Sequence, residues 1–309
     1  MSGIEWIVPV VMTVITASTP LLFAATGELV VEKAGVLNLG VEGMMLVGAI
    51  AAFAIASSTG SGSLGIIAGA AAGALMALIF AWLTLSLLAN QVATGLALTI
   101  FGVGFSALIG AGFVGFAIPP LPKLDIPFIS EIPIIGPLVF GQDFLVYLSF
   151  AAVIGVGWFL KSTHGGMVLR AVGESHESAH AIGYNVIGIR YLATMFGGAM
   201  SGLGGAYLSL SYTPMWAENM TSGRGWIALA LVVFATWRPG RLMLGAYMFG
   251  GITILQLNAQ GLGLDVPSQL MSMLPYLATI LVLVLISRDQ SRIRLNAPAC
   301  LGQPFRPAH

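Results

Sequence analysis

Long apolar runs, separated by short polar or glycine- and proline-rich segments, make up most of the chain. A helix needs about 20 apolar residues to cross the roughly 30 Å hydrocarbon core of a bilayer. By this measure the sequence predicts membrane spans at 6–26, 36–56, 63–87, 92–114, 139–160, 191–210, 224–237, 240–258 and 271–287. The pattern is typical of an all-α, polytopic transmembrane helix bundle of about 8–10 spans, some of them broken or re-entrant.

Composition excludes a water-soluble enzyme. Of 309 residues, 57% are hydrophobic and only 8% are charged, whereas a soluble domain carries about 25% charged residues. No charge run or low-complexity segment divides the chain, so we predict a single transmembrane domain over 1–309. The net charge is zero and the basic residues are scattered, which argues against nucleic acid as a partner.

Lysine and arginine in short loops predict the orientation. The segment 161–190 carries Lys161, Arg170 and Arg190, and the tail 288–309 carries four arginines, so both are expected on the cytoplasmic side. The proline-rich stretch 118–138 holds one lysine and is expected outside.

The segment 224–258 is unusual because its first helix is too short to span. Its 14 residues at 224–237 rise only about 21 Å. The turn that follows, at 237–241, contains a Pro-Gly pair between two arginines. It either reaches the cytoplasmic interface with snorkelling arginines, which we favour, or stops within a protein-lined cavity.

Two polar residues interrupt the apolar run 36–56. Asn38 and Glu42 are four residues apart, which places them on one face of a helix. A charge in mid-bilayer costs about 2.5–3.5 kcal/mol, so Glu42 must face protein or water, or be protonated. Gly40 and Gly43 would allow the helix to break and expose a solute pathway. The alternative is that Glu42 only accepts hydrogen bonds from a neighbouring helix.

Asn90 and Gln91 lie between two predicted spans, where their amides could hydrogen-bond a base or a sugar. Asn90 could equally be an ordinary helix N-cap. Small residues at four-residue spacing in 197–205 predict close helix packing rather than solute contact.

Enzymatic signatures are missing. The chain has no Gly-Lys dipeptide and therefore no P-loop, so any ATP must be hydrolysed by another subunit. Cys300 is the single cysteine, and His176 and His180 have metal-ligand spacing without a third ligand. We therefore predict no catalytic residue, no cofactor and no metal site.

The largest internal hydrophilic segment predicts a short helix between Gly173 and Gly183. Glu174 and Glu177 lie near its start, where the helix dipole favours acidic groups, and Gly183 is a stop signal. Such a helix suits docking in a groove of a soluble partner, although composition alone favours a plain surface loop. The residues expected to mediate this contact are Arg170, Gly173, Glu174, Glu177, Ala181 and Gly183.

Four segments in the same order resemble permease subunits of nucleoside-type ABC importers, in the wider group of ribose and branched-chain amino acid permeases. They are GELVVEKAGVLNLGVEGMM at 27–45, the segment 170–183, MTSGRGWIALA at 220–230 and APACLGQPF at 297–305. The likeness covers nearly the whole chain. Thr99 departs from it, since an asparagine is common there, and Ser175 and His176 replace Asn-Pro-like residues.

The resemblance implies a multi-pass permease of the bacterial inner (plasma) membrane that imports a nucleoside or a related purine or pyrimidine compound. Its implied partners are cytoplasmic ATP-binding subunits, a second permease, identical or homologous, an extracytoplasmic solute-binding protein and membrane lipid. The implied coupling helix that docks on the ATPase is 173–183. The implied solute pathway contains Asn38, Glu42, Asn90 and Gln91.

Two alternatives stay open. The same architecture could import a simple sugar or a branched-chain amino acid. From a different class, the chain could be an ion-coupled secondary transporter with Glu42 as its proton site.

Overall fold

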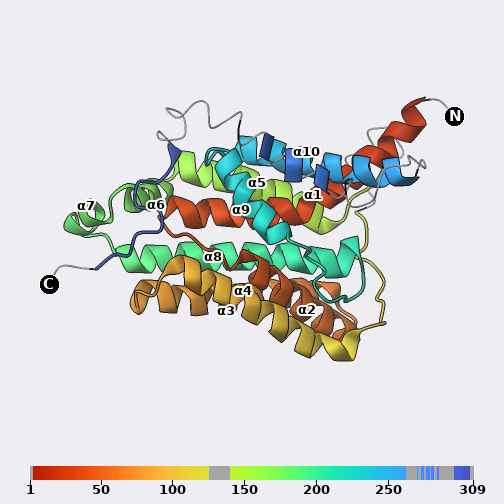
Figure 1. Cartoon of the computed structure of the whole chain (residues 1–309), viewed down its shortest axis with the longest axis horizontal. Coiled ribbons are helices and arrows are strands. Elements are labelled where there is room, and N and C mark those ends of the chain that lie inside the picture. Colours follow the sequence, from red (N-terminus) through yellow and green to blue (C-terminus); the bar gives the residue numbers. More distant parts are fainter. Residues whose placement is uncertain are drawn as a thin grey trace.

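Nearly all the described residues of the computed structural model are helical, and these residues contain isolated β-bridges but no strand, which confirms the all-α expectation. The described residues are 3–124, 140–261, 270, 273, 274, 276–278, 280, 281, 284 and 296–306. Most of the long helices lie side by side along the long axis of the molecule, whereas the short helix α9 runs obliquely to it (Figure 1).

The described elements follow one another along the chain as helices and single helical turns. They are α1 (Gly3–Lys33), α2 (Val41–Thr59), α3 (Gly62–Ala81), η1 (Trp82–Ser86), α4 (Gln91–Gly110), η2 (Ala111–Phe113), α5 (Phe144–Ser162), α6 (His164–Glu174), α7 (His176–Ala181), α8 (Val186–Tyr207), η4 (Leu208–Tyr212), α9 (Arg224–Phe234) and α10 (Pro239–Gly261).

Within the described ranges, seven helices are long and apolar enough to cross a membrane. They correspond to seven of the predicted spans. The predicted span 224–237 is the short helix α9, whose 11 residues rise only about 16 Å. The predicted span 271–287 lies largely outside the described residues. The chain is therefore a multi-pass membrane protein.

The predicted boundary between the first two spans is wrong. Helix α1 continues to Lys33 instead of ending at 26, and α2 begins at Val41 instead of 36. Gly35 adopts a positive φ of 81°, which ends the first helix. The side chain of Asn38 accepts a bond from the amide of Gly40 at 2.9 Å, and this local bond competes with helix formation.

Helix α8 forms the centre of the bundle and packs against α1, α2 and α3 (Figure 1). Its glycines make this possible, because a Cβ at Gly202 would collide with the carbonyl oxygen of Gly69 on α3. A Cβ at Gly48 of α2 would lie 2.5 Å from the Cα of Gly202. The prediction of close packing along 197–205 is confirmed.

The segment 161–190 contains α6 and α7, and the described part of the tail, 296–306, lies at the same end of the bundle (Figure 1). The amide of Cys300 in the tail donates to the carbonyl oxygen of Gly173 at 2.9 Å. Lys33, at the end of α1, donates to the carbonyl oxygen of Asn296 at 2.6 Å. The tail therefore joins the end of α1 to the loop.

Helix α9 and the turn after it reach this same end. The indole nitrogen of Trp237 donates to Oε2 of Glu32, one residue before the end of α1, at 2.6 Å. This position favours the interfacial turn over a turn that stops in an internal cavity.

We predict that Gly202→Ala destabilises the protein by about 1–3 kcal/mol, because the added methyl group overpacks the α3–α8 contact. The matched control is Gly104→Ala in α4, where a Cβ would meet nothing within 4 Å. This control should be neutral or slightly stabilising, since alanine is a better helix former than glycine. Thermal unfolding of the detergent-solubilised proteins measures both, and equal melting temperatures would contradict the packing model.

Candidate functional site

An unwound segment at 34–40 runs from the end of α1 into the bundle before α2 begins (Figure 1). A Cβ on Gly102, in the middle of α4, would lie 2.6 Å from the Cα of Gly43, so the first turn of α2 lies beside the middle of a spanning helix. The break expected at Gly40 is therefore present, and it covers the whole segment before α2.

Buried side chains satisfy the backbone of this segment. The amide of Leu37 donates to Oε1 of Gln91 at 2.8 Å, and the amide of Asn38 donates to Oε1 of Glu28 at 3.3 Å. The hydroxyl of Thr99 donates to the carbonyl oxygen of Leu39 at 3.0 Å. Since unpaired backbone groups are costly at membrane depth, these three side chains make the break possible.

Glu42 connects the first turn of α2 to the start of α9. Its Oε1 accepts from the hydroxyl of Thr221 at 2.5 Å and from the amide of Gly223 at 2.8 Å. Its Oε2 accepts from the amide of Gly225 at 2.6 Å. The carboxylate thus satisfies orphan donors at the N-terminus of α9 and also lies in the first turn of α2, where both helix dipoles favour negative charge.

Gly225 is required for this approach, because a Cβ there would lie 2.5 Å from the backbone nitrogen of Glu42. The two discontinuous helices α2 and α9 therefore meet with their N-termini at one buried carboxylate.

Glu28 and Gln91 each keep one free polar atom. Oε2 of Glu28 and Nε2 of Gln91 are buried and have no hydrogen-bond partner among the described residues. Glu28 was missed as an individual candidate at the sequence level, although a carboxylate within an apolar run was the available signal. Each atom is a buried polar group whose hydrogen-bonding capacity the described residues leave unused.

Asn90 lies apart from this cluster. It is exposed and caps α4, with Oδ1 accepting from the amide of Ala93 at 3.0 Å. Of the four predicted pathway residues, the structure brings Asn38, Glu42 and Gln91 to the unwound segment, and it places Asn90 at the surface.

A small pocket of about 200 Å³ begins at the N-terminus of α9 and extends between α1 and α10. Its polar groups come from Ser222, Arg224, Thr253 and Gln256, with aromatic rings from Phe249 and Tyr276. The guanidinium of Arg224 lies 5.7 Å from the ring centroid of Tyr212 and donates to the carbonyl oxygens of the preceding turn. This pocket offers hydrogen-bond donors and acceptors beside aromatic surfaces.

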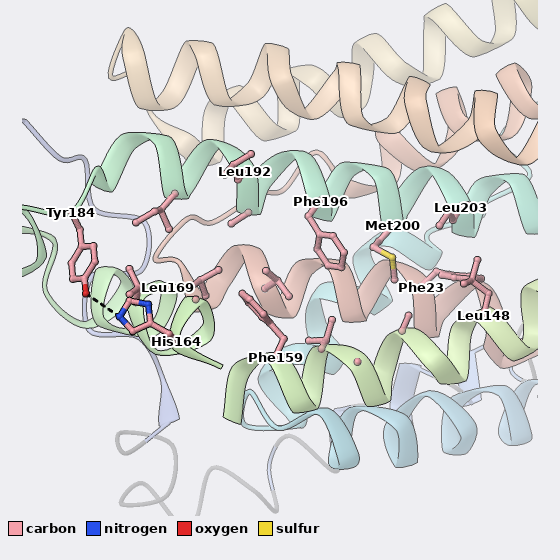
Figure 2. Close-up of a pocket in the computed structure, with 18 residues that line it drawn as sticks. Phe23, Leu148, Phe159, His164, Leu169, Tyr184, Leu192, Phe196, Met200 and Leu203 are labelled. Carbon is pink, nitrogen blue, oxygen red and sulfur yellow. Dashed lines mark hydrogen bonds between the residues drawn. The ribbon is translucent and has the colours of Figure 1, made fainter. Parts of the chain in front are cut away.

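A larger groove of about 810 Å³ lies between α5 and α8, with α1 as its floor (Figure 2). Its walls are apolar along most of their length. At one end His164 and Tyr184 form a hydrogen bond, with 3.4 Å between Nε2 of the histidine and the hydroxyl oxygen of the tyrosine. This groove has too few polar groups for a polar solute, and its walls suit contact with hydrocarbon.

The predicted helix between Gly173 and Gly183 is divided in the structure: its first residues form the end of α6, and the rest form the short helix α7. The sequence at Ser175 interrupts it, because this side chain caps α7 by accepting from the amide of Ser178. Gly173 belongs to α6 and is buried, and a Cβ there would collide with the carbonyl oxygen of Lys33. Gly183 ends α7 with a φ of 93°, as the stop signal predicted.

The remaining residues of the predicted contact are on the surface. Arg170, Glu174, Glu177, Ala181 and Gly183 are all exposed. The docking of this surface stays a prediction. Within the described ranges, no group of three or more His, Cys, Asp or Glu side chains could hold a metal ion.

Residues 10–284 match the family described as the permease component of the branched-chain amino acid transport system. A predicted glucose ABC transporter permease of Haloferax volcanii is 41% identical over 94% of this chain and 95% of its own. No solved structure matches significantly.

Two further relatives transport nucleosides by name. A guanosine ABC transporter permease of Bacillus subtilis is 32% identical, with 96% of each chain covered. A nucleoside ABC transporter permease of Lactococcus lactis is 30% identical over 89% of this chain and 91% of its own.

We predict that Glu42→Gln destabilises the protein by about 1–3 kcal/mol, because an amide NH₂ would replace one acceptor oxygen and leave a buried backbone donor unpaired. The matched control is Glu218→Gln, the same change at an exposed carboxylate in the segment before α9. Thermal unfolding in detergent compares the two. Unchanged stability of Glu42→Gln would show that the carboxylate does not hold the helix ends together.

Proposed function

Because this chain belongs to the permease-component family of branched-chain amino acid transport systems, and is thus the membrane subunit of an ABC transporter, we propose that it imports a neutral solute with a sugar ring. A nucleoside is the first candidate, supported by the guanosine and nucleoside permeases among its relatives. A monosaccharide is the second, supported by the relative named for glucose. As in that family, the chain is a transport component rather than an enzyme.

The observation that carries this proposal is the meeting of two broken helices at Glu42. Discontinuous helices are the usual way for transporters to present polar groups at membrane depth, where an intact helix offers none. The free atoms of Glu28 and Gln91 lie along this break and supply an acceptor and a donor for solute hydroxyl groups.

The small pocket beside α9 suits a sugar ring better than an amino acid. Arg224 and Gln256 can donate to ring hydroxyl groups, and aromatic side chains flank them. An amino acid would also bring an ammonium group, and the described residues that line the pocket include no carboxylate to pair with it. A branched-chain amino acid is therefore the weaker solute candidate, although the matching family is described by the transport of such amino acids.

Ion-coupled transport through Glu42 is also less well supported. Both carboxylate oxygens accept bonds from N–H or O–H donors, and protonation would remove acceptor capacity that these donors need. We therefore keep Glu42 in the pathway as the residue that holds the break open, with import driven by ATP hydrolysis on partner subunits.

The proposed assembly separates the membrane pathway, which this chain provides, from ATP hydrolysis, which partner subunits provide. Two permease subunits, cytoplasmic ATP-binding subunits and an extracytoplasmic solute-binding protein would work together in the bacterial plasma membrane. Asn90 stays a proposed residue of the solute pathway at its cytoplasmic end.

Uptake by the assembled transporter tests the solute class. We expect ATP-dependent accumulation of radiolabelled guanosine or uridine, or else of glucose or ribose, and none of leucine. Accumulation of leucine alone would overturn the proposal, and accumulation by this subunit alone under a pH gradient would favour an ion-coupled carrier.

A matched pair of variants tests the small pocket. Gln256→Leu should raise the KM for uptake about tenfold, because a solute hydroxyl group would lose its partner in the pocket. Asn258→Leu, two residues further along α10 and exposed, is the control and should leave the KM unchanged. Equal KM values would place the solute elsewhere.

The exposed surface of α7 is tested by charge reversal. Glu177→Lys should lower solute-stimulated ATP hydrolysis by about tenfold or more, because reversed charge at a docking surface opposes association. Glu218→Lys makes the same change at an exposed residue outside α7 and should have no effect. Normal stimulation of ATP hydrolysis in Glu177→Lys would show that α7 is an ordinary surface helix and does not dock on the ATP-binding subunit.

A further inference from the structure

Arg190 is a buried cation that bonds three separate parts of the chain. It lies in the first turns of α8 and is only 1% exposed. Its Nε donates to the carbonyl oxygen of Ala34 at 3.1 Å, and its Nη2 donates to that of Gly35 at 3.3 Å. Its Nη1 donates to the carbonyl oxygen of Gln303 in the tail at 3.2 Å.

The fourth partner is on the predicted docking helix. Nη2 of Arg190 lies 2.8 Å from Nδ1 of His176, the first residue of α7. A guanidinium has no acceptor, so Nδ1 must carry a lone pair and the histidine must be neutral, with its proton on Nε2. Burial and the neighbouring Arg190 lower the pKa of His176, which favours this neutral form.

These bonds connect α7 to the unwound segment by a short path. Ala34 and Gly35 begin that segment, and three residues further along lies Asn38. Within the described ranges no carboxylate forms an ion pair with Arg190, so carbonyl groups and one imidazole stabilise its charge. Separating any of them from a buried guanidinium is costly, and the parts must therefore move together.

The tail reinforces the same connection. The amide of Gly302 donates to the carbonyl oxygen of Gly35 at 3.1 Å. The ring of Phe305 lies 5.3 Å from that of His176, between α7 and the start of α8. The described tail thus holds α7 against Arg190 and leaves little freedom for α7 to shift without displacing Gly35.

We propose that Arg190 is the positioning residue that transmits displacement of α7 to the unwound segment at 34–40, with His176 as the link on the helix that moves. This inference rests on the proposed function, in which α7 contacts the ATP-binding subunit. In this role Arg190 acts on the protein backbone and not on the solute. It acts by coupling the cytoplasmic contact to the backbone that leads to Asn38 and Glu42.

The test uses His176, since Arg190→Lys would leave several carbonyl groups unpaired and could prevent folding. His176→Leu removes the acceptor for Nη2, whereas His176→Asn restores one, because Oδ1 of asparagine can take the place of Nδ1. The matched control is His180→Leu, at a second histidine of α7 that contacts Phe305 but has no bond to Arg190.

The measurement is the ratio of solute imported to ATP hydrolysed by the complete transporter in proteoliposomes. We expect His176→Leu to lower this ratio about tenfold, the equivalent of one lost hydrogen bond to a charged group, and His176→Asn and His180→Leu to retain it. An unchanged ratio in His176→Leu, or no recovery in His176→Asn, would overturn the inference.

A second readout does not depend on the solute. Hydrogen exchange at the amides of 34–40 should change when the ATP-binding subunits close in the wild type and in His176→Asn, but not in His176→Leu. The same response in all three would overturn the relay. A wild-type transporter that shows this response but moves no nucleoside or sugar would instead contradict the proposed function alone.

Discussion

The structure depends on satisfying backbone polar groups where two helices break inside the bundle. Lipid offers no hydrogen bonds, so an interrupted helix is stable only if protein supplies the missing partners. Glu42 supplies them at the start of α9, and Gln91, Glu28 and Thr99 supply them along the segment that precedes α2. Removing these polar side chains would leave the breaks without support.

Charge is arranged to match the polarity of the helix ends. The carboxylate of Glu42 lies where two helix N-termini present N–H groups, and the guanidinium of Arg190 lies where the end of α1 presents carbonyl groups. Each buried charge is therefore stabilised by backbone dipoles rather than by an opposite charge. The two sites lie at opposite ends of the unwound segment at 34–40, so a displacement of the backbone at one end can be transmitted to the other.

The rest of the bundle gives this stretch a rigid frame. Glycines of α8 allow α2 and α3 to approach within backbone contact, and such close packing leaves little room for independent movement. The large groove beside α5 is apolar, whereas the small pocket begins at the broken end of α9. The polar groups that line a pocket are thus gathered near the start of α9, where the proposed function places the solute.

The sequence by itself determined the membrane class, seven of the spans, the glycine-rich packing of α8 and the likeness to ABC permeases, because apolar length and residue order express these directly. It indicated Asn38 and Glu42, since polar residues in apolar runs are costly wherever the helix packs, and Gln91, since an amide between two spans can form hydrogen bonds. It did not determine the start of α2, the burial of Gly173, the place of Asn90 or the role of Arg190. Those depend on which distant backbone groups face each side chain: Arg190 and Gly35 are 155 residues apart, and only the packing of α1, α8 and the tail brings them together.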